Sequence, residues 1–107
     1  MVRDKAFHDY ILMDVFSGID GIVSRPMFGG YGFYVHGKIF AIISGGKLYF
    51  KVGEGNIKDF EEKGSRPFVY NAKGKSISMR YWELPEELFE NKEELEIWIR
   101  RSSEQIK

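Results

Sequence analysis

Two histidines, His8 and His36, are the residues of this sequence best suited to acid–base or metal chemistry, and neither has a recognisable set of partners. A zinc site needs three or four ligands, usually with some close in the sequence, and none accompany His8. The absence of cysteine excludes disulfides, thiolate catalysis and cysteine-based zinc sites. The serines lack the Gly-x-Ser-x-Gly elbow of hydrolases, so a triad through His36 has no support. We therefore expect no catalytic residue, no metal and no cofactor.

Adjacent acids are a second feature that could suggest catalysis. Glu61–Glu62, Glu86–Glu87 and Glu93–Glu94 each occupy consecutive positions in predicted helices. Side chains at consecutive helical positions do not face each other. Near a helix N-terminus such charges favour the helix dipole instead. We interpret them as solvent-exposed charges.

The run from Arg25 to Tyr34, RPMFGGYGFY, combines closely spaced glycines with aromatic residues. A phosphate-binding loop needs Gly-x-x-x-x-Gly-Lys-Ser/Thr before a helix, whereas a strand is predicted here. In a dinucleotide fingerprint, Val35 would occupy the place of the third glycine. We therefore predict a structural role, a β-bulge or strand crossing in which the glycines make room for Phe28, Tyr31 and Tyr34.

The composition indicates one domain covering residues 1–107, because 43% hydrophobic and 16% aromatic residues can build a core. No apolar run approaches the roughly 20 residues that span a bilayer. The N-terminal residues do not resemble a signal peptide. We expect a cytoplasmic protein, and the net charge of 0 gives no global attraction to nucleic acid or membrane.

Hydrophobic periodicity and turn residues predict an α+β fold in which helices cover one face of an antiparallel sheet. Asn56 and Asn91 are expected to cap the second and the last helix, and Gly64 to end the second. The other face of the sheet is left partly open. The predicted elements are a helix at 4–16, strands at 22–28, 31–36, 39–44 and 47–52, a helix at 56–63, strands at 67–71 and 76–82, a short helix from 85 and a final helix after 91.

Charge is unevenly distributed along the chain. Residues 21–53 and 65–82 together contain 8 of the 16 basic residues and none of the 16 acidic ones. Both stretches are predicted to be strands, while the acids lie in the helices or at their ends. The sequence therefore predicts a basic face and a mostly acidic face.

We assign six residues of two strands to a partner-binding surface on the open face. With Ile77, Met79 and Tyr81 facing inward, alternation would place the intervening polar and aromatic residues outward. Such a surface could bind an acidic protein segment, stack and hold nucleic acid, or pair two copies of the chain. It could also be solvated sheet surface covered by long basic side chains. The six residues are Lys47, Tyr49, Lys51, Ser78, Arg80 and Trp82.

A set of residues between Arg25 and Pro85 has the order and spacing of a known family. The set begins with Arg25, Met27, Phe28, Gly29, Gly30, Gly32 and Tyr34, continues with Lys47, Leu48, Tyr49, Lys51, Phe60, Gly64, Pro67, Phe68 and Tyr70, and ends with Ser78, Met79, Tyr81, Trp82, Glu83 and Pro85. It resembles the N-terminal domain of TfoX, also called Sxy, a regulator of competence. We expect its first seven residues to be structural.

The resemblance implies a two-layer α+β fold and a bacterial or archaeal cytoplasmic protein that regulates DNA-uptake genes with a transcription factor. Catalysis and metal binding are not implied. The complete regulators carry a second, helical domain, and this chain ends at Lys107. Our main hypothesis is a non-enzymatic adaptor that binds a protein partner, with transcription machinery as the candidate partner and a homodimer as a second option. The alternatives are direct nucleic-acid binding and an uncharacterised small enzyme or ligand-binding domain.

Overall fold

The structure, a computed structural model, describes residues 5–27, 30–72 and 74–105. For residues 70–72 and 75–79 it describes the backbone but not the side chains. In this part of the chain the helices and strands follow one another in the predicted order, which confirms the α+β fold class. The N-terminal helix changes to a π-helical turn, and a 3₁₀ helix precedes the last helix. The elements are α1 (Lys5–Tyr10), η1 (Ile11–Val15), β1 (Ile22–Met27), β2 (Gly30–Val35), β3 (Lys38–Ser44), β4 (Lys47–Lys51), α2 (Ile57–Glu62), β5 (Pro67–Ala72), β6 (Lys75–Glu83), η2 (Glu86–Glu90) and α3 (Lys92–Ser103).

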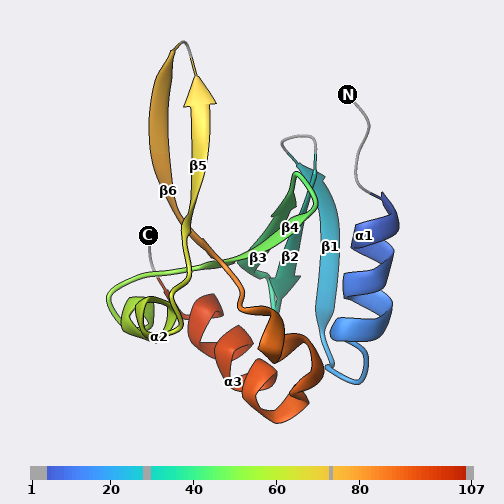
Figure 1. Cartoon of the computed structure of the whole chain (residues 1–107). Helices are drawn as coiled ribbons and strands as arrows, with labels where there is room; N and C mark the ends of the chain where they lie inside the picture. The colour runs from blue at the N-terminus through green and yellow to red at the C-terminus, as the bar shows by residue number, and fades with distance from the viewer. Residues whose placement is uncertain (1–4, 28–29, 73, 106–107) are drawn as a thin grey trace.

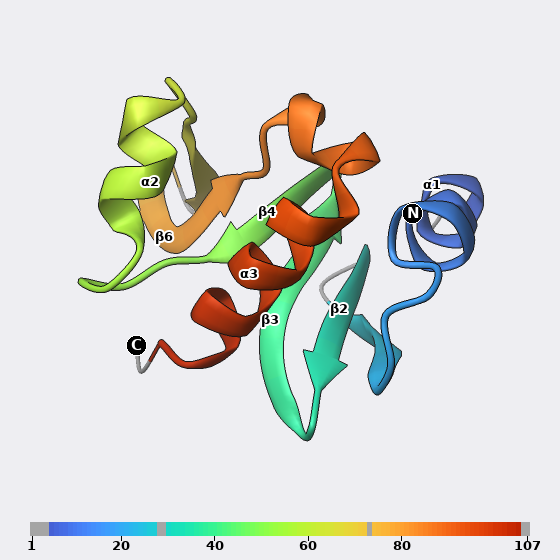
Figure 2. The ribbon, with the colours of Figure 1, turned by 90° about the horizontal axis from the view of Figure 1, so that it is seen from below.

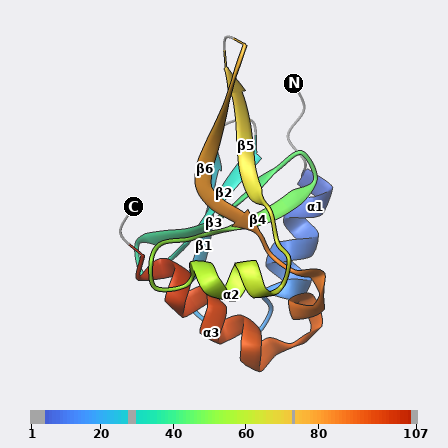
Figure 3. The same ribbon diagram turned by 60° about the vertical axis from the view of Figure 1, so that its left-hand side comes forward.

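The described strands form one six-stranded antiparallel sheet in the order β1-β2-β3-β4-β6-β5. β1 and β5 are the two edges. The β5–β6 hairpin projects from the rest of the sheet, away from α2 and α3 (Figures 1 and 3). α3 crosses β3 and β4, and α1 lies toward β2 (Figure 2). One face of the sheet is therefore covered by helices, and we call the other the open face.

Tight turns set the strand order locally. His36 and Gly37 connect β2 to β3, and Gly45 and Gly46 connect β3 to β4, all with positive φ. Two-residue hairpin turns of this kind match the right-handed twist of the strands. His36, at φ 51, is the non-glycine residue with positive φ in the described chain. Short local signals therefore account for the β2–β3–β4 meander.

Four phenylalanines form the centre of the core on the covered face. Phe16, Phe33, Phe40 and Phe50 are almost fully buried, and their ring centroids lie 5.2–6.4 Å apart. Edge-to-face arrangements such as Phe40 on Phe50 are favoured by the ring quadrupoles. Residues from η1, α2 and α3 join the same cluster.

The described sheet is irregular where β2 pairs with β3, between Phe33 and Tyr34 at the end of the glycine run, and again in β5 between Pro67 and Val69. Phe33 pairs with Ala41 and Tyr34 with Ile39, so Phe40 is an extra residue in β3. A bulge lets Phe40 and Ala41 both enter the core. β1 and β2 keep a continuous register, so the predicted bulge or crossing between these two strands is wrong for the described residues, and the bulge lies between β2 and β3 instead. Phe28 and Gly29 lie outside the described residues.

Helix ends agree with the sequence in two of three places. The Asn91 side chain accepts a hydrogen bond from the Glu94 N–H, which confirms this cap. Gly64 donates to Glu61, and the next amide reaches back to Phe60, as in a Schellman ending. Asn56 occupies the predicted N-cap position of α2, but its buried side chain makes no cap hydrogen bond.

Candidate functional site

The open face is identified by strand pairing. Tyr49 lies opposite Ile42 on one side and Glu83 on the other, and Lys51 lies opposite Tyr81. Directly paired residues project to the same side of a sheet. Tyr49, Lys51, Tyr81 and Glu83 therefore share the open face, whereas Phe50 faces the core.

The same register corrects the predicted orientation of β6. Trp82 pairs with Phe50 and packs against the core. Arg80 has the same parity as Trp82, so the two lie on the other side from Lys51 and Tyr81. The prediction that Arg80 and Trp82 share the open face with Tyr49 and Lys51 is wrong. Arg80 is nevertheless exposed, and the side chain of Ser78 lies outside the described ones.

Aromatic side chains line the middle of the open face. The rings of Tyr49 and Phe68 lie 4.9 Å apart between centroids. Burial raises the pKa of the Tyr49 hydroxyl, and the negative charge of Glu83 raises it further. Burial also raises the pKa of Tyr81, with a smaller contribution from Tyr34. These half-buried rings give the face a rigid apolar centre.

Three basic side chains surround the aromatic centre. Arg25 lies over the ring of Tyr34, with the guanidinium carbon 5.6 Å from the ring centroid. Lys47 approaches Glu83 at 3.8 Å. Among the described residues, Arg25 and Lys51 form no ion pair within 4.0 Å. The prediction that all acids lie in helices or at their ends is wrong at Glu83. This acid belongs to β6 and lies on the basic face.

A hollow with a volume of about 310 Å³ lies at the β1 end of the open face. It is lined by Val23, Arg25, Tyr34 and Gly37. Val23 is 54% exposed and lies directly opposite Tyr34. The sequence analysis did not assign Val23 to the surface, although strand alternation with Arg25 could have identified it.

The glycines of the run allow close approach of the backbone and of one side chain. A Cβ on Gly30 would lie 1.9 Å from the carbonyl oxygen of Ile43. A Cβ on Gly32 would lie 2.3 Å from the sulfur of Met27. Gly32 therefore makes room for Met27 on the open face, and the close approaches at Gly30 and Gly32 support the structural role predicted for these glycines.

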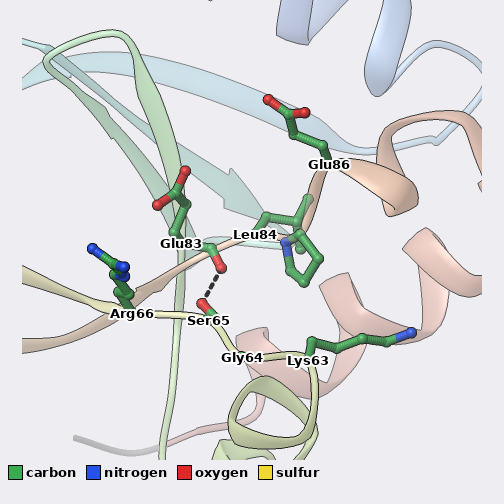
Figure 4. A pocket seen from close by; sticks show the side chains of 8 residues that line it. Lys63, Gly64, Ser65, Arg66, Glu83, Leu84 and Glu86 are labelled. Carbon is green, nitrogen blue, oxygen red and sulfur yellow. Dashed lines mark hydrogen bonds between the residues drawn. The ribbon is translucent and has the colours of Figure 1, made fainter.

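A second hollow, of about 200 Å³, lies between the end of α2, the start of β5 and the end of β6. Ser65 donates a hydrogen bond of 2.5 Å to the carbonyl oxygen of Glu83. Lys63 and Arg66 point away from each other (Figure 4). Lys63 instead pairs with Glu87, which raises the pKa of the lysine. The hollow thus does not gather its basic groups around one anion.

A hydrogen-bonded chain of Asp9, His8 and Ser24 joins α1 to β1. His8 contacts Asp9 through Nδ1 at 2.9 Å and Ser24 through Nε2 at 2.8 Å. Its ring packs on Tyr31, with centroids 4.0 Å apart. Ser24 lines neither of the two hollows above. This chain, which the sequence analysis missed because Ser24 is 16 positions from His8, holds the helix against the sheet.

No other arrangement of the described residues indicates chemistry of its own. They contain no group of three or more histidine and acidic side chains that could hold a metal ion. No described helix is both long and apolar enough to cross a membrane. The open face is consequently the candidate site.

Comparison with protein families matches residues 14–106 to the TfoX N-terminal domain. The match covers the whole sheet and α3. A comparison with curated proteins finds no match for the chain. With nearly all of its residues matched, this chain belongs to the TfoX N-terminal domain family.

Proposed function

We propose that this protein is a non-catalytic regulatory domain that binds an acidic protein partner through the open face of its sheet. The observation that carries the proposal is the aromatic centre of Tyr49, Phe68 and Tyr81, bordered by Arg25 and Lys51, which form no ion pair with any described acid. Aromatic residues and arginine are enriched in protein interfaces. Unpaired bases at the border favour and orient an acidic partner.

The family membership and the resemblance to competence regulators support a role in transcription, with a component of the transcription machinery as the partner. Many residues that carry this resemblance lie on the open face, where their aromatic and basic side chains are available to a partner. Those described there are Arg25, Met27, Gly32, Tyr34, Lys47, Tyr49, Lys51, Phe68, Tyr81 and Glu83.

Nucleic acid is the competing ligand for this face. Aromatic side chains that can stack on nucleobases, with basic side chains nearby, are suited to binding single-stranded nucleic acid. A phosphate backbone is uniformly negative and would bring charge close to the Glu83 carboxylate, which lies opposite Tyr49 and close to Lys47. A protein segment can instead place an acidic side chain near Arg25 or Lys51 and a neutral or basic one near Glu83. We therefore favour a protein partner.

The test is photo-cross-linking in the native cell with a photoreactive phenylalanine at position 49, and at Glu96 on α3 as the control site. The proposal predicts that position 49 captures a transcription protein that Glu96 does not capture. The captured protein is then purified and its affinity measured. Lys51→Glu should weaken binding about tenfold or more, while Lys58→Glu, the same charge change on α2, should not.

Two results would overturn the proposal. One is equal binding by Lys51→Glu and the unmodified protein. The other is a combination of two findings: a short DNA duplex causes amide shifts on β4 and β6 that added salt reverses, and no protein is captured at position 49. Salt reversal indicates phosphate contacts, because the logarithm of the affinity falls by about 0.9 per log unit of salt for each contact.

A further inference from the structure

Among the described strands, β1 is paired on one side only, and its other side adjoins the open face. β2 is its neighbour in the sheet, and β1 ends the strand order. Alternate residues of an edge strand direct their N–H and C=O groups away from the sheet, where another extended chain can pair with them. Pro26 has no N–H and limits such pairing toward the end of the strand. Each residue of β1 from Ile22 to Arg25 has an N–H, and alternate ones point away from β2.

The hollow of about 310 Å³ lies beside this same part of β1. Val23 and Arg25 form its outer wall, and Tyr34 lies behind them. A side chain of a chain paired with β1 would enter the hollow from the edge. In strand addition, backbone hydrogen bonds provide affinity and pockets for alternate side chains provide specificity.

Arg25 determines which side chain fits. Its guanidinium lies over Tyr34, and no acid of the described chain pairs with it. The planar guanidinium presents paired donors that match a carboxylate. Contact with the tyrosine ring restrains the guanidinium and leaves its donors available.

We propose that β1 receives an extended segment of the acidic partner as an added strand, with a carboxylate of that segment paired to Arg25 in the hollow and an apolar residue covering Val23. This inference rests on the proposed function, because it assigns the partner's binding mode. It makes Arg25 the specificity-determining residue of the interface.

A second copy of the chain fits this edge less well. Pairing two β1 strands about a two-fold axis would bring both Arg25 side chains to the same face of the joined sheet, at nearby positions. Like charges at such positions oppose pairing. Complementary charge therefore favours an acidic segment over a second β1.

The probe is a displayed library of random peptides, selected in parallel on the whole protein, on Arg25→Gln and on Arg100→Gln. Arg100 is an exposed arginine of α3 and serves as the matched control. We expect the protein and Arg100→Gln to enrich peptides in which an acidic residue is flanked by apolar residues at alternate positions. Arg25→Gln should lose the acidic preference and bind the best peptide about tenfold more weakly or worse.

The best peptide is then titrated into labelled protein. The proposal predicts slower amide hydrogen exchange in Ile22–Arg25 and contacts between peptide and β1 backbones in nuclear Overhauser spectra. Methylation of alternate peptide nitrogens should abolish binding. Val23→Glu, a change at an exposed position, should weaken binding of the unmethylated peptide.

Three outcomes would overturn the inference: no enriched peptide, an acidic preference that survives in Arg25→Gln, or shifts that appear on α2 and α3 instead of β1. The partner captured at position 49 separates the two proposals. If it binds Arg25→Gln normally and Lys51→Glu poorly, strand addition is wrong and the open-face function stands. If it binds both variants normally, the open-face function is wrong as well.

Discussion

Lys51 of β4 lies directly opposite Tyr81 of β6, and this pair joins the β5–β6 hairpin to the meander on the open face. The next pair, Phe50 with Trp82, faces the core. A single step along β6 thus separates a solvent-facing aromatic residue from a core aromatic residue. The partner surface that we propose depends on this register.

The tyrosines of the open face should make the stability sensitive to alkaline pH. The pKa of Tyr81 is raised above its ordinary value of 10.0 by burial, so the folded state holds this proton more tightly than the unfolded chain. Its contribution to stability is complete below about pH 10 and is lost as the pH rises through the raised pKa. In urea unfolding from about pH 9 to 11, the free energy of unfolding should decline less steeply with pH for Tyr81→Phe than for the unmodified protein. Tyr10→Phe, on exposed α1, is the control and should leave the decline unchanged.

Replacement of Lys92 by methionine should destabilise the protein by about 1–2 kcal/mol. The Lys92 ammonium donates hydrogen bonds to the carbonyl oxygens of Asp14, Val15 and Ser17, and so ties α3 to the end of η1. A cation at a helix C-terminus also interacts favourably with the helix dipole. Urea unfolding measures the loss, and Lys58→Met provides the matched change at an exposed site. An equal loss in both variants would show that these hydrogen bonds contribute nothing measurable.

Alanine at the two buried glycines of β2 should have different costs. A Cβ on Gly30 meets the backbone oxygen of Ile43, which cannot move without its strand, so we expect a loss of about 2–3 kcal/mol. A Cβ on Gly32 meets the end of the flexible Met27 side chain, so we expect about 1 kcal/mol. Thermal or urea unfolding compares the two. The Gly32→Ala cost should shrink in a Met27→Ala background, and an unchanged cost would exclude Met27 as its cause.

Asn56 should be the most sensitive polar residue outside the open face. Its side chain accepts a hydrogen bond from the Gly53 N–H and donates to the Lys51 carbonyl and the Ser102 hydroxyl. Asn56→Ala leaves buried groups without partners and should cost about 2–3 kcal/mol.

Asn91→Ala is the control for this prediction, because it removes an exposed helix cap and should cost about 1 kcal/mol. A double-mutant cycle of Asn56→Ala with Ser102→Ala should show coupling. Additive losses would contradict the hydrogen bond between Asn56 and Ser102.

The sequence was sufficient for features that depend on neighbouring residues. The paired glycines between β3 and β4, Gly64 after α2 and Asn91 before α3 all act on backbone within a few residues of their own position. These signals predicted the element order and hence the fold class. The family resemblance, carried by short motifs, was found for the same reason.

The candidate site was predicted in part. Lys47, Tyr49 and Lys51 were assigned to the open face because the alternation of β4 is unambiguous, with Leu48 and Phe50 buried. β6 lacks this contrast between apolar and polar residues at its end, because Tyr81 and Trp82 are both aromatic and either could face the core. The Asn56 side chain was expected at a helix cap, but tertiary contacts with α3 bury it elsewhere.

The sequence by itself thus determined which segments become helices, strands and turns, because those choices are made by local backbone preferences and hydrophobic periods. Only the tertiary structure decided which side of β6 faces the core, where Phe40 bulges from β3, and that Arg25 and Tyr34 form one hollow. A shift of one residue in strand register moves every side chain to the opposite face. The register is set by contacts between residues far apart in the chain, such as Phe50 with Trp82, and these exist only once the sheet has assembled.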